Sequence, residues 1–129
     1  MSVTIEISPG EAIDRVSILE LKLRHLPAGV HVELRKELDQ LREQLSRTRG
    51  AFPGLSALEE RLREVNATLW QAEEQLREHE RRQEFDSQFI DCARAVYVNN
   101  DLRCAIKHAI DGLFGVSKTE RKSFSLPTV

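Results

Sequence analysis

The segment LSALEERLREVNATLWQAEEQL, residues 55–76, decides the fold. Its apolar residues recur at a 4-3-4-3-4 spacing, the heptad-like pattern of a helix that packs along another helix. They are Leu58, Leu62, Val65, Leu69, Ala72 and Leu76. Ser56 and Glu59 have the spacing of a capping box, which predicts that the helix begins at Ser56. We therefore expect a long amphipathic helix with one buried seam.

The residues before this segment predict a partner for the seam. Leu34, Leu38, Leu41 and Leu45 follow a 4-3-4 spacing within residues 30–49. The break that follows contains two glycines and one proline, which mark a loop. Two heptad-like helices joined by a short loop form an antiparallel hairpin. The sequence therefore predicts a helical hairpin over about residues 30–85.

A further helix and an arm precede the hairpin. Ser8 can cap the helix, Pro9 fits its first position, and Pro27 stops it after Leu26. Residues 3–7 alternate β-branched and polar side chains, which predicts a short strand or an extended arm over residues 1–7. A strand needs a partner, and either residues 124–126 or a second copy of the chain could supply it.

Two shorter helices are expected over about residues 86–115. Asn99, Asn100 and Asp101 are predicted to end the first and to cap the second, and Gly115 ends the second. Residues 116–129 form a tail. The prediction is a single all-α domain over residues 1–129. Its architecture is an antiparallel helical hairpin or bundle of about five helices with a short N-terminal strand or arm.

Composition restricts the class of protein. The 129 residues are 40% hydrophobic, 31% charged and 5% aromatic, with a net charge of −2. The acidic balance and the few aromatics argue against nucleic-acid binding. No apolar run approaches the roughly 20 residues that span a bilayer, and the N-terminus lacks the features of a signal peptide. Two cysteines without a CxxC pair indicate free thiols and a cytoplasmic location.

A polar stripe follows the seam of residues 55–76. The first four members each lie one residue after a seam position, about 100° further round the helix, and the fifth continues their spacing. The members are Asn66, Trp70, Glu73, Arg77 and Glu80, and they include the only tryptophan. One interpretation is a row of ion pairs beside the seam, such as Glu73 with Arg77. The other is a supporting polar network that faces another element, to which Asp101 would also belong.

A basic group in the C-terminal part is a candidate anion-binding site. Arg103 and Lys107 are like charges at i, i+4, which repel unless an anion or an acidic partner lies nearby. The candidate residues are Arg94, Tyr97, Arg103 and Lys107. The ligand would be a phosphate, a carboxylate, a sugar phosphate or a nucleotide sugar. In the alternative interpretation the countercharges come from within the fold, from Glu73, Glu80 and Asp101.

Other chemistry has weak support in the sequence. Cys104 and His108 lie at i, i+4 and amount to half of a zinc site at most. The P-loop, dinucleotide-binding and nucleophile-elbow motifs do not occur. We therefore expect no metal and no cofactor, and we assign no catalytic residue.

Motifs along nearly the whole chain resemble those of a family of short bacterial proteins of unknown function. They are ISPGE at residues 7–11 with Asp14, ILELK at 18–22, Leu69-Trp70 with Glu73, and the run from Arg94 through Tyr97, Asn100-Asp101 and Arg103 to Lys107. The sequence departs from the family pattern at Glu74, Arg121 and Phe124, which puts the role of the tail in question. The resemblance implies an association with surface-polysaccharide and glycosyltransferase genes, and so a protein partner in that synthesis, but no activity.

Two functional hypotheses follow. The first is a non-enzymatic helical interaction or scaffold protein that self-associates as a homodimer, because the chain has a helical seam, a strand-like arm and no recognisable nucleophile with its base. The second is a protein or enzyme that binds an anionic metabolite in an Arg/Lys-lined pocket. Binding of nucleic acid through the basic C-terminal segment is a third, disfavoured possibility.

Overall fold

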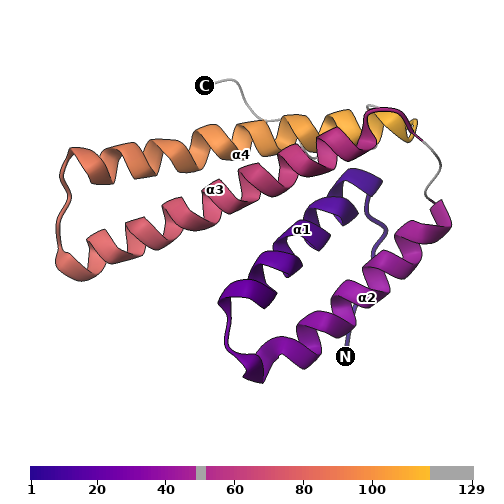
Figure 1. Ribbon diagram of the computed structural model, residues 1–129, viewed down its shortest axis with the longest axis horizontal. Helices are drawn as coiled ribbons and strands as arrows, with labels where there is room; N and C mark the ends of the chain where they lie inside the picture. Colours follow the sequence, from indigo (N-terminus) through magenta and orange to yellow (C-terminus); the bar gives the residue numbers. More distant parts are fainter. Residues whose placement is uncertain (49–51, 117–129) are drawn as a thin grey trace.

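The structure is a computed structural model that describes residues 1–48 and 52–116, and it consists of two helical hairpins (Figure 1). The first hairpin contains α1 (Pro9–His25), the short 3₁₀ helix η1 (Ala28–Val30) and α2 (His31–Thr48). The second contains α3 (Leu55–Arg82) and α4 (Ser87–Leu113). The described residues contain no strand, so the all-α class is confirmed.

The pairing of the helices differs from the prediction. A hairpin over residues 30–85 is wrong, because α2 packs along α1 and α3 packs along α4 (Figure 1). The leucine spacing nevertheless identified the inward faces, since Leu38 of α2 and Leu62 of α3 are both buried. Apolar spacing shows which face of a helix is buried, but any apolar surface can cover that face.

The helix α4 runs without a break through the point where two helices were predicted to meet. The side-chain amide Nδ2 of Asn99 donates to the backbone carbonyl oxygen of Ala95 at 2.8 Å. Asn99 thus bonds back within its own helix and does not end it. The prediction of about five helices is therefore corrected to four α-helices and one 3₁₀ turn within the described part of the chain.

The N-terminal arm is extended but is not a strand. Residues 1–8 have no regular secondary structure, and Val3 is 86% exposed. The arm is confirmed and the strand is wrong, because a strand requires a hydrogen-bonded neighbour and the described residues provide none. The predicted partner at residues 124–126 lies outside the described residues.

The helix boundaries follow local sequence signals in most places. Ser8 Oγ accepts a hydrogen bond from the backbone N–H of Glu11 at 3.2 Å, and α1 ends at His25, just before Pro27, as predicted. The helix α3 begins at Leu55, one residue before the predicted cap Ser56. Gly54 precedes it with φ 88°, a left-handed conformation that favours glycine over the residues that cap with their side chains.

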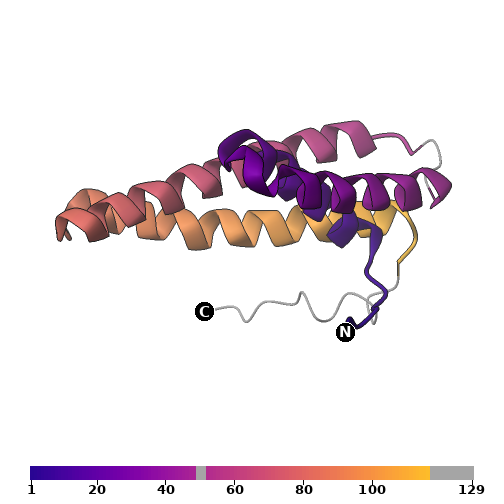
Figure 2. The same ribbon diagram turned by 90° about the horizontal axis from the view of Figure 1, so that it is seen from below.

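The core lies where α1 crosses the second hairpin. Its buried members are Ile13, Leu55, Leu62, Val65, Leu69, Ile106 and Ile110. They come from α1, from the first part of α3 and from the last part of α4. We call this end the covered half of the α3–α4 hairpin. Trp70 of α3 contacts His25 of α1, and Arg103 of α4 contacts Asp14 of α1. Past these contacts the hairpin extends beyond α1 and α2 as two helices alone (Figures 1 and 2), and we call residues 73–102 in this part the bare half.

A membrane span needs a long helix with few charges. Within the described residues, none of the helices combines enough length with enough apolar character to cross a membrane.

Candidate functional site

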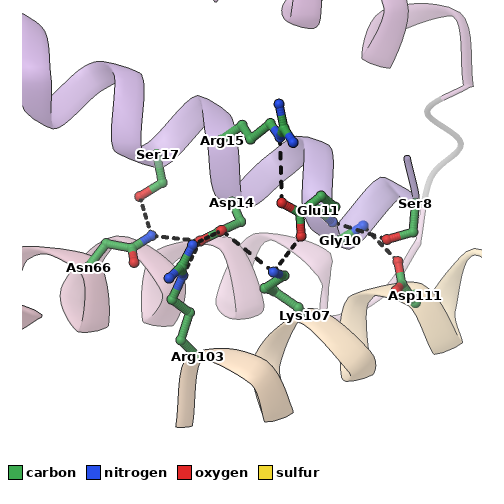
Figure 3. A network of polar contacts seen from close by, with 10 residues as sticks. All are labelled: Ser8, Gly10, Glu11, Asp14, Arg15, Ser17, Asn66, Arg103, Lys107 and Asp111. Carbon is green, nitrogen blue, oxygen red and sulfur yellow. Dashed lines mark hydrogen bonds and ion pairs between the residues drawn. The ribbon is translucent and has the colours of Figure 1, made fainter. Parts of the chain in front are cut away.

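Polar side chains from three helices meet beneath α1 in the covered half (Figure 3). Asp14 of α1 is fully buried and lies at the centre. Its Oδ1 accepts hydrogen bonds from Asn66 Nδ2 of α3 at 3.0 Å and from Arg103 Nε of α4 at 2.9 Å. Arg103 Nη2 also donates to Asp14 Oδ2 at 2.5 Å, so the arginine binds both carboxylate oxygens. One carboxylate therefore ties α1 to both helices of the second hairpin.

A second pair of charges extends the network along α1. Lys107 Nζ of α4 lies 2.5 Å from Glu11 Oε2 and 3.8 Å from Asp14 Oδ2. Glu11 is also 3.5 Å from Arg15 Nε at the surface. Lys107 is buried, and burial of a charged group is tolerated when an opposite charge neutralises it. Two acids of α1 thus face two bases of α4.

Asn66 of α3 makes a second hydrogen bond to α1. Besides Asp14, Asn66 Nδ2 donates to Ser17 Oγ at 3.2 Å. Asn66 and Ser17 are both buried. The side-chain amide of Asn66 thus donates to both Asp14 and Ser17. These hydrogen bonds replace those that the buried groups would make with water, so α1 can pack against α3 at this contact.

The N-terminus of α1 is anchored on α4. The backbone N–H of Gly10 donates to Asp111 Oδ1 at 2.7 Å, and Asp111 is fully buried. A Cβ atom at Gly10 would lie 2.4 Å from the carbonyl oxygen of Lys107 and 2.8 Å from Asp111 Oδ1, so only glycine fits. The Asp111 carboxylate complements the positive end of the α1 dipole. Its Oδ2 accepts no hydrogen bond from the described residues.

The electrostatics of the network keep its arginine charged. The hydrogen bonds to Asp14 raise the pKa of Arg103, and the nearby carboxylate charges add to this, while burial opposes it. The guanidinium therefore stays protonated throughout the ordinary pH range. Its contacts to Asp14 make it a fixed part of the fold.

The structure divides the predicted anion-binding residues between two sides of α4. Arg103 and Lys107 face α1, whereas Arg94 and Tyr97 are exposed. Arg103 lies nine positions after Arg94, which is about two and a half helical turns and places the two on opposite sides of α4. The four side chains therefore do not line one site. The countercharges of Arg103 and Lys107 come from α1 and not from the predicted acids.

The predicted supporting network is divided in the same way. Asn66 is buried against α1, and the Trp70 ring stacks on His25 with centroids 4.9 Å apart. Further along α3, Arg77 pairs with Glu74 at 2.7 Å and not with Glu73. The other members, Glu73, Glu80 and Asp101, are exposed. The polar stripe of α3 thus faces another helix only as far as Trp70.

The residues of α1 that complete the network had no assigned role in the sequence prediction. Asp14 and Ser17 lie on the same face of α1 as the buried Ile13 and Leu21. A carboxylate and a hydroxyl within an apolar helical face must find partners when that face is buried. This was the available signal, and it pointed to charged or amide partners on another helix.

A cleft of about 330 Å³ lies beside the network between α1, α2 and α3. Its charged lining residues pair with one another. Glu20 of α1 lies 3.5 Å from Arg42 of α2 and 3.8 Å from Arg63 of α3, measured between side-chain nitrogen and oxygen atoms. Because these charges compensate each other, the cleft holds helices together and does not present a single sign of charge to a ligand.

One group of possible metal ligands lies at the turn between α3 and α4. Ligand atoms of His79, Glu84 and Asp86 lie within 4.8 Å of one another, and both carboxylates are exposed. Asp86 already caps α4, because its Oδ1 accepts from the backbone N–H of Phe89 at 3.1 Å. His79 Nδ1 also lies 3.0 Å from the carbonyl oxygen of Glu84. The hairpin turn alone accounts for this convergence. Cys104 and His108 belong to no such group within the described residues.

The whole sequence was compared with known proteins. It matches the model of a family described as "Family of unknown function (DUF6165)" over residues 3–128. The chain belongs to this family. The match covers both helical hairpins, so the polar network and the bare half both lie inside the matched region. No curated protein and no solved structure matches the chain. Membership of DUF6165 confirms the resemblance to a family of unknown function, whereas the bacterial origin and the polysaccharide association stay predictions.

Proposed function

We propose that this chain is a helical interaction or scaffold protein whose binding surface is the outer side of α4, in the bare half and at the adjoining edge of the covered half. The observation that carries the proposal is a row of apolar side chains exposed there. Ile90 is 48% exposed, Tyr97 58%, Val98 54% and Leu102 37%. Isolated apolar residues at a surface are ordinary, but several of them gathered on one side of a helix are typical of an interaction site.

These side chains share one side of the helix. Counted from Ile90 at about 100° per residue, the row occupies a sector of about 140°. Three charged residues and one alanine lie within it, namely Asp91 beside Ile90, Arg94, Asp101 and Ala105. We define the α4 stripe as Ile90, Arg94, Tyr97, Val98, Asp101, Leu102 and Ala105. All seven residues are exposed, so the stripe is available to another protein.

The charges of the covered half favour this function over an anion site. Arg103 and Lys107 would be the strongest anion-binding groups, but each contacts a carboxylate of α1. An anion would have to displace Asp14 or Glu11, and a displaced Asp14 would be left as a buried charge without its arginine. The α4 stripe requires no such displacement.

The thiols agree with the compartment expected from the sequence. Cys92 and Cys104 are both free, and Cys92 Sγ donates to Gln75 Oε1 at 3.2 Å. Free, partly exposed thiols persist in a reducing environment. We therefore propose that the protein acts in the cytoplasm.

A photo-crosslinking experiment tests the proposed surface. The full-length protein carries p-benzoylphenylalanine at Val98, and a matched variant carries it at Val32 of α2, which is also apolar and 76% exposed. After irradiation in cells, we expect one discrete adduct from position 98 that is lost when Tyr97→Asp is added, and no such adduct from position 32. The proposal is wrong if position 98 gives no adduct or behaves as position 32 does.

A further inference from the structure

We propose that the partner of the α4 stripe is a second copy of this chain, packed antiparallel across a two-fold axis that passes between Tyr97 and Val98. This inference rests on the proposed function, because the dimer would use the same surface of α4. Self-association was expected from the sequence on other grounds, namely a seam and an unpaired strand. The surface and the register proposed here come from the charges and apolar residues of α4.

The two charges of the stripe lie symmetrically about its centre. Arg94 precedes the point between Tyr97 and Val98 by as many residues as Asp101 follows it. In an antiparallel pair of identical helices, residues equally far from the axis on either side lie level with each other. Arg94 of one copy is therefore level with Asp101 of the partner subunit. The two-fold axis produces this ion pair twice.

The opposite orientation of the two helices is disfavoured by the same charges. In a parallel pair about a two-fold axis, each arginine of the stripe would meet the equivalent arginine, and each aspartate the equivalent aspartate. Like charges placed directly together across an interface disfavour association. The charge pattern is thus complementary to itself only when one copy is reversed.

The apolar residues of the stripe other than Leu102 also fit this register. Ile90 lies as far before the axis as Ala105 lies after it, so a large side chain meets a small one at each end. At the centre Tyr97 faces Val98 of the partner subunit. Alternation of large and small residues allows helix axes to approach to the usual 8–10 Å.

Arg94 and Asp101 are available for this contact. Neither takes part in an ion pair or hydrogen bond with another described residue, unlike Arg103 and Lys107 on the other side of α4. The stripe is about 22 Å long from Ile90 to Ala105. This is a small interface, so we expect a reversible dimer whose population depends on protein concentration.

Sedimentation equilibrium of the full-length protein tests the register. The wild type should show a monomer–dimer equilibrium. Arg94→Asp and Asp101→Arg each replace both attractive pairs with repulsive ones, and each should raise the dissociation constant about tenfold. The double variant Arg94→Asp/Asp101→Arg restores both pairs in reversed polarity and should return to within about threefold of the wild type. A mixture of the two single variants should form heterodimers more tightly than either forms homodimers.

Arg35→Asp provides the matched control, because Arg35 is exposed on α2 and undergoes the same change of charge. It should leave the dissociation constant unchanged. At a concentration where all variants are monomeric, their melting temperatures should agree, because every substituted residue is exposed.

The inference is overturned if the wild type stays monomeric, or if charge reversal has no effect, or if the double variant does not recover. The crosslink at Val98 separates these failures from failure of the proposed function. An adduct with a different protein, together with a monomeric wild type, overturns the inference alone. Absence of both the adduct and the dimer overturns both proposals.

Discussion

The two halves of the α3–α4 hairpin treat charged residues differently. In the covered half, α1 lies across the hairpin, and the inward-facing charges pair between helices, as Arg103 does with Asp14. In the bare half the charges pair along one helix, as Arg77 does with Glu74 and Arg81 does with Glu78, and they are exposed. The position of α1 therefore decides whether a polar residue of the hairpin holds the fold together or stays available to a partner.

The largest expected effect comes from removing the central carboxylate. Asp14→Ala leaves Arg103 and Lys107 with less negative charge nearby, in a setting where Asn66 also loses an acceptor. We expect the free energy of unfolding to fall by about 3–5 kcal/mol, which urea denaturation measures. Glu74→Ala removes an ion pair of the bare half and should cost less than about 0.5 kcal/mol. Equal losses in the two variants would remove the distinction between the halves.

A smaller effect is expected where α1 touches α4. Gly10→Ala places a Cβ atom 2.4 Å from the carbonyl oxygen of Lys107, so α1 must shift. We expect a loss of about 1–3 kcal/mol in urea denaturation. Gly112 lies in α4 with no atom within 4 Å of a Cβ built there, and Gly112→Ala should stabilise the protein by about 0.5–1 kcal/mol. A neutral Gly10→Ala variant would show that the close approach does not exist.

The boundary between the halves can be located with Trp70. Its ring stacks on His25, the last residue of α1, with an angle of 20° between the ring planes. His25→Ala should lower the free energy of unfolding by about 0.5 kcal/mol and shift the fluorescence maximum of this single tryptophan to longer wavelength. An unchanged emission spectrum would place the end of α1 away from Trp70.

The smallest expected effect is a titration in the bare half. The hydrogen bond from Arg81 lowers the pKa of Glu78, and the arginine charges contribute in the same direction. Any stability from this contact is present above the ordinary glutamate pKa and is lost as the pH falls through the lowered one. Carboxyl carbon NMR should place the Glu78 midpoint below its position in an Arg81→Ala variant. Coincident midpoints would show that the pair does not form in solution.

Much of the fold could be predicted because its signals are local. Ser8 and Pro27 bound α1, and the leucine spacing marks the buried faces of α2 and α3. The partners of those faces could not be predicted, because a periodic apolar face is equally satisfied by any other. The continuity of α4 was also missed, since the hydrogen bond from Asn99 back to Ala95 depends on a helix that is already formed.

The candidate site could be predicted only in part, because its local signals lie on α4 whereas its partners lie far away in the chain. Arg103 and Lys107 were correctly expected to need an anion or an acidic partner. The sequence pattern predicts acidic partners on α3 and α4, whereas the observed partner Asp14 lies on α1, 89 residues before Arg103 in the chain. Contacts between residues so far apart in the chain depend on how the helices pair. The sequence predicts one hairpin made of α2 and α3, whereas the structure has two, α1 with α2 and α3 with α4.

The hydrogen bond between Gly10 and Asp111 joins residues 101 positions apart. During synthesis the α1–α2 hairpin leaves the ribosome long before α4, with the Asp14 carboxylate on its apolar face and no guanidinium to meet it. Docking of that hairpin must wait until nearly all of α4 has emerged, so the first residues translated are among the last to reach their native contacts. A nascent chain stalled before Arg103 would therefore display α1 to chaperones and proteases.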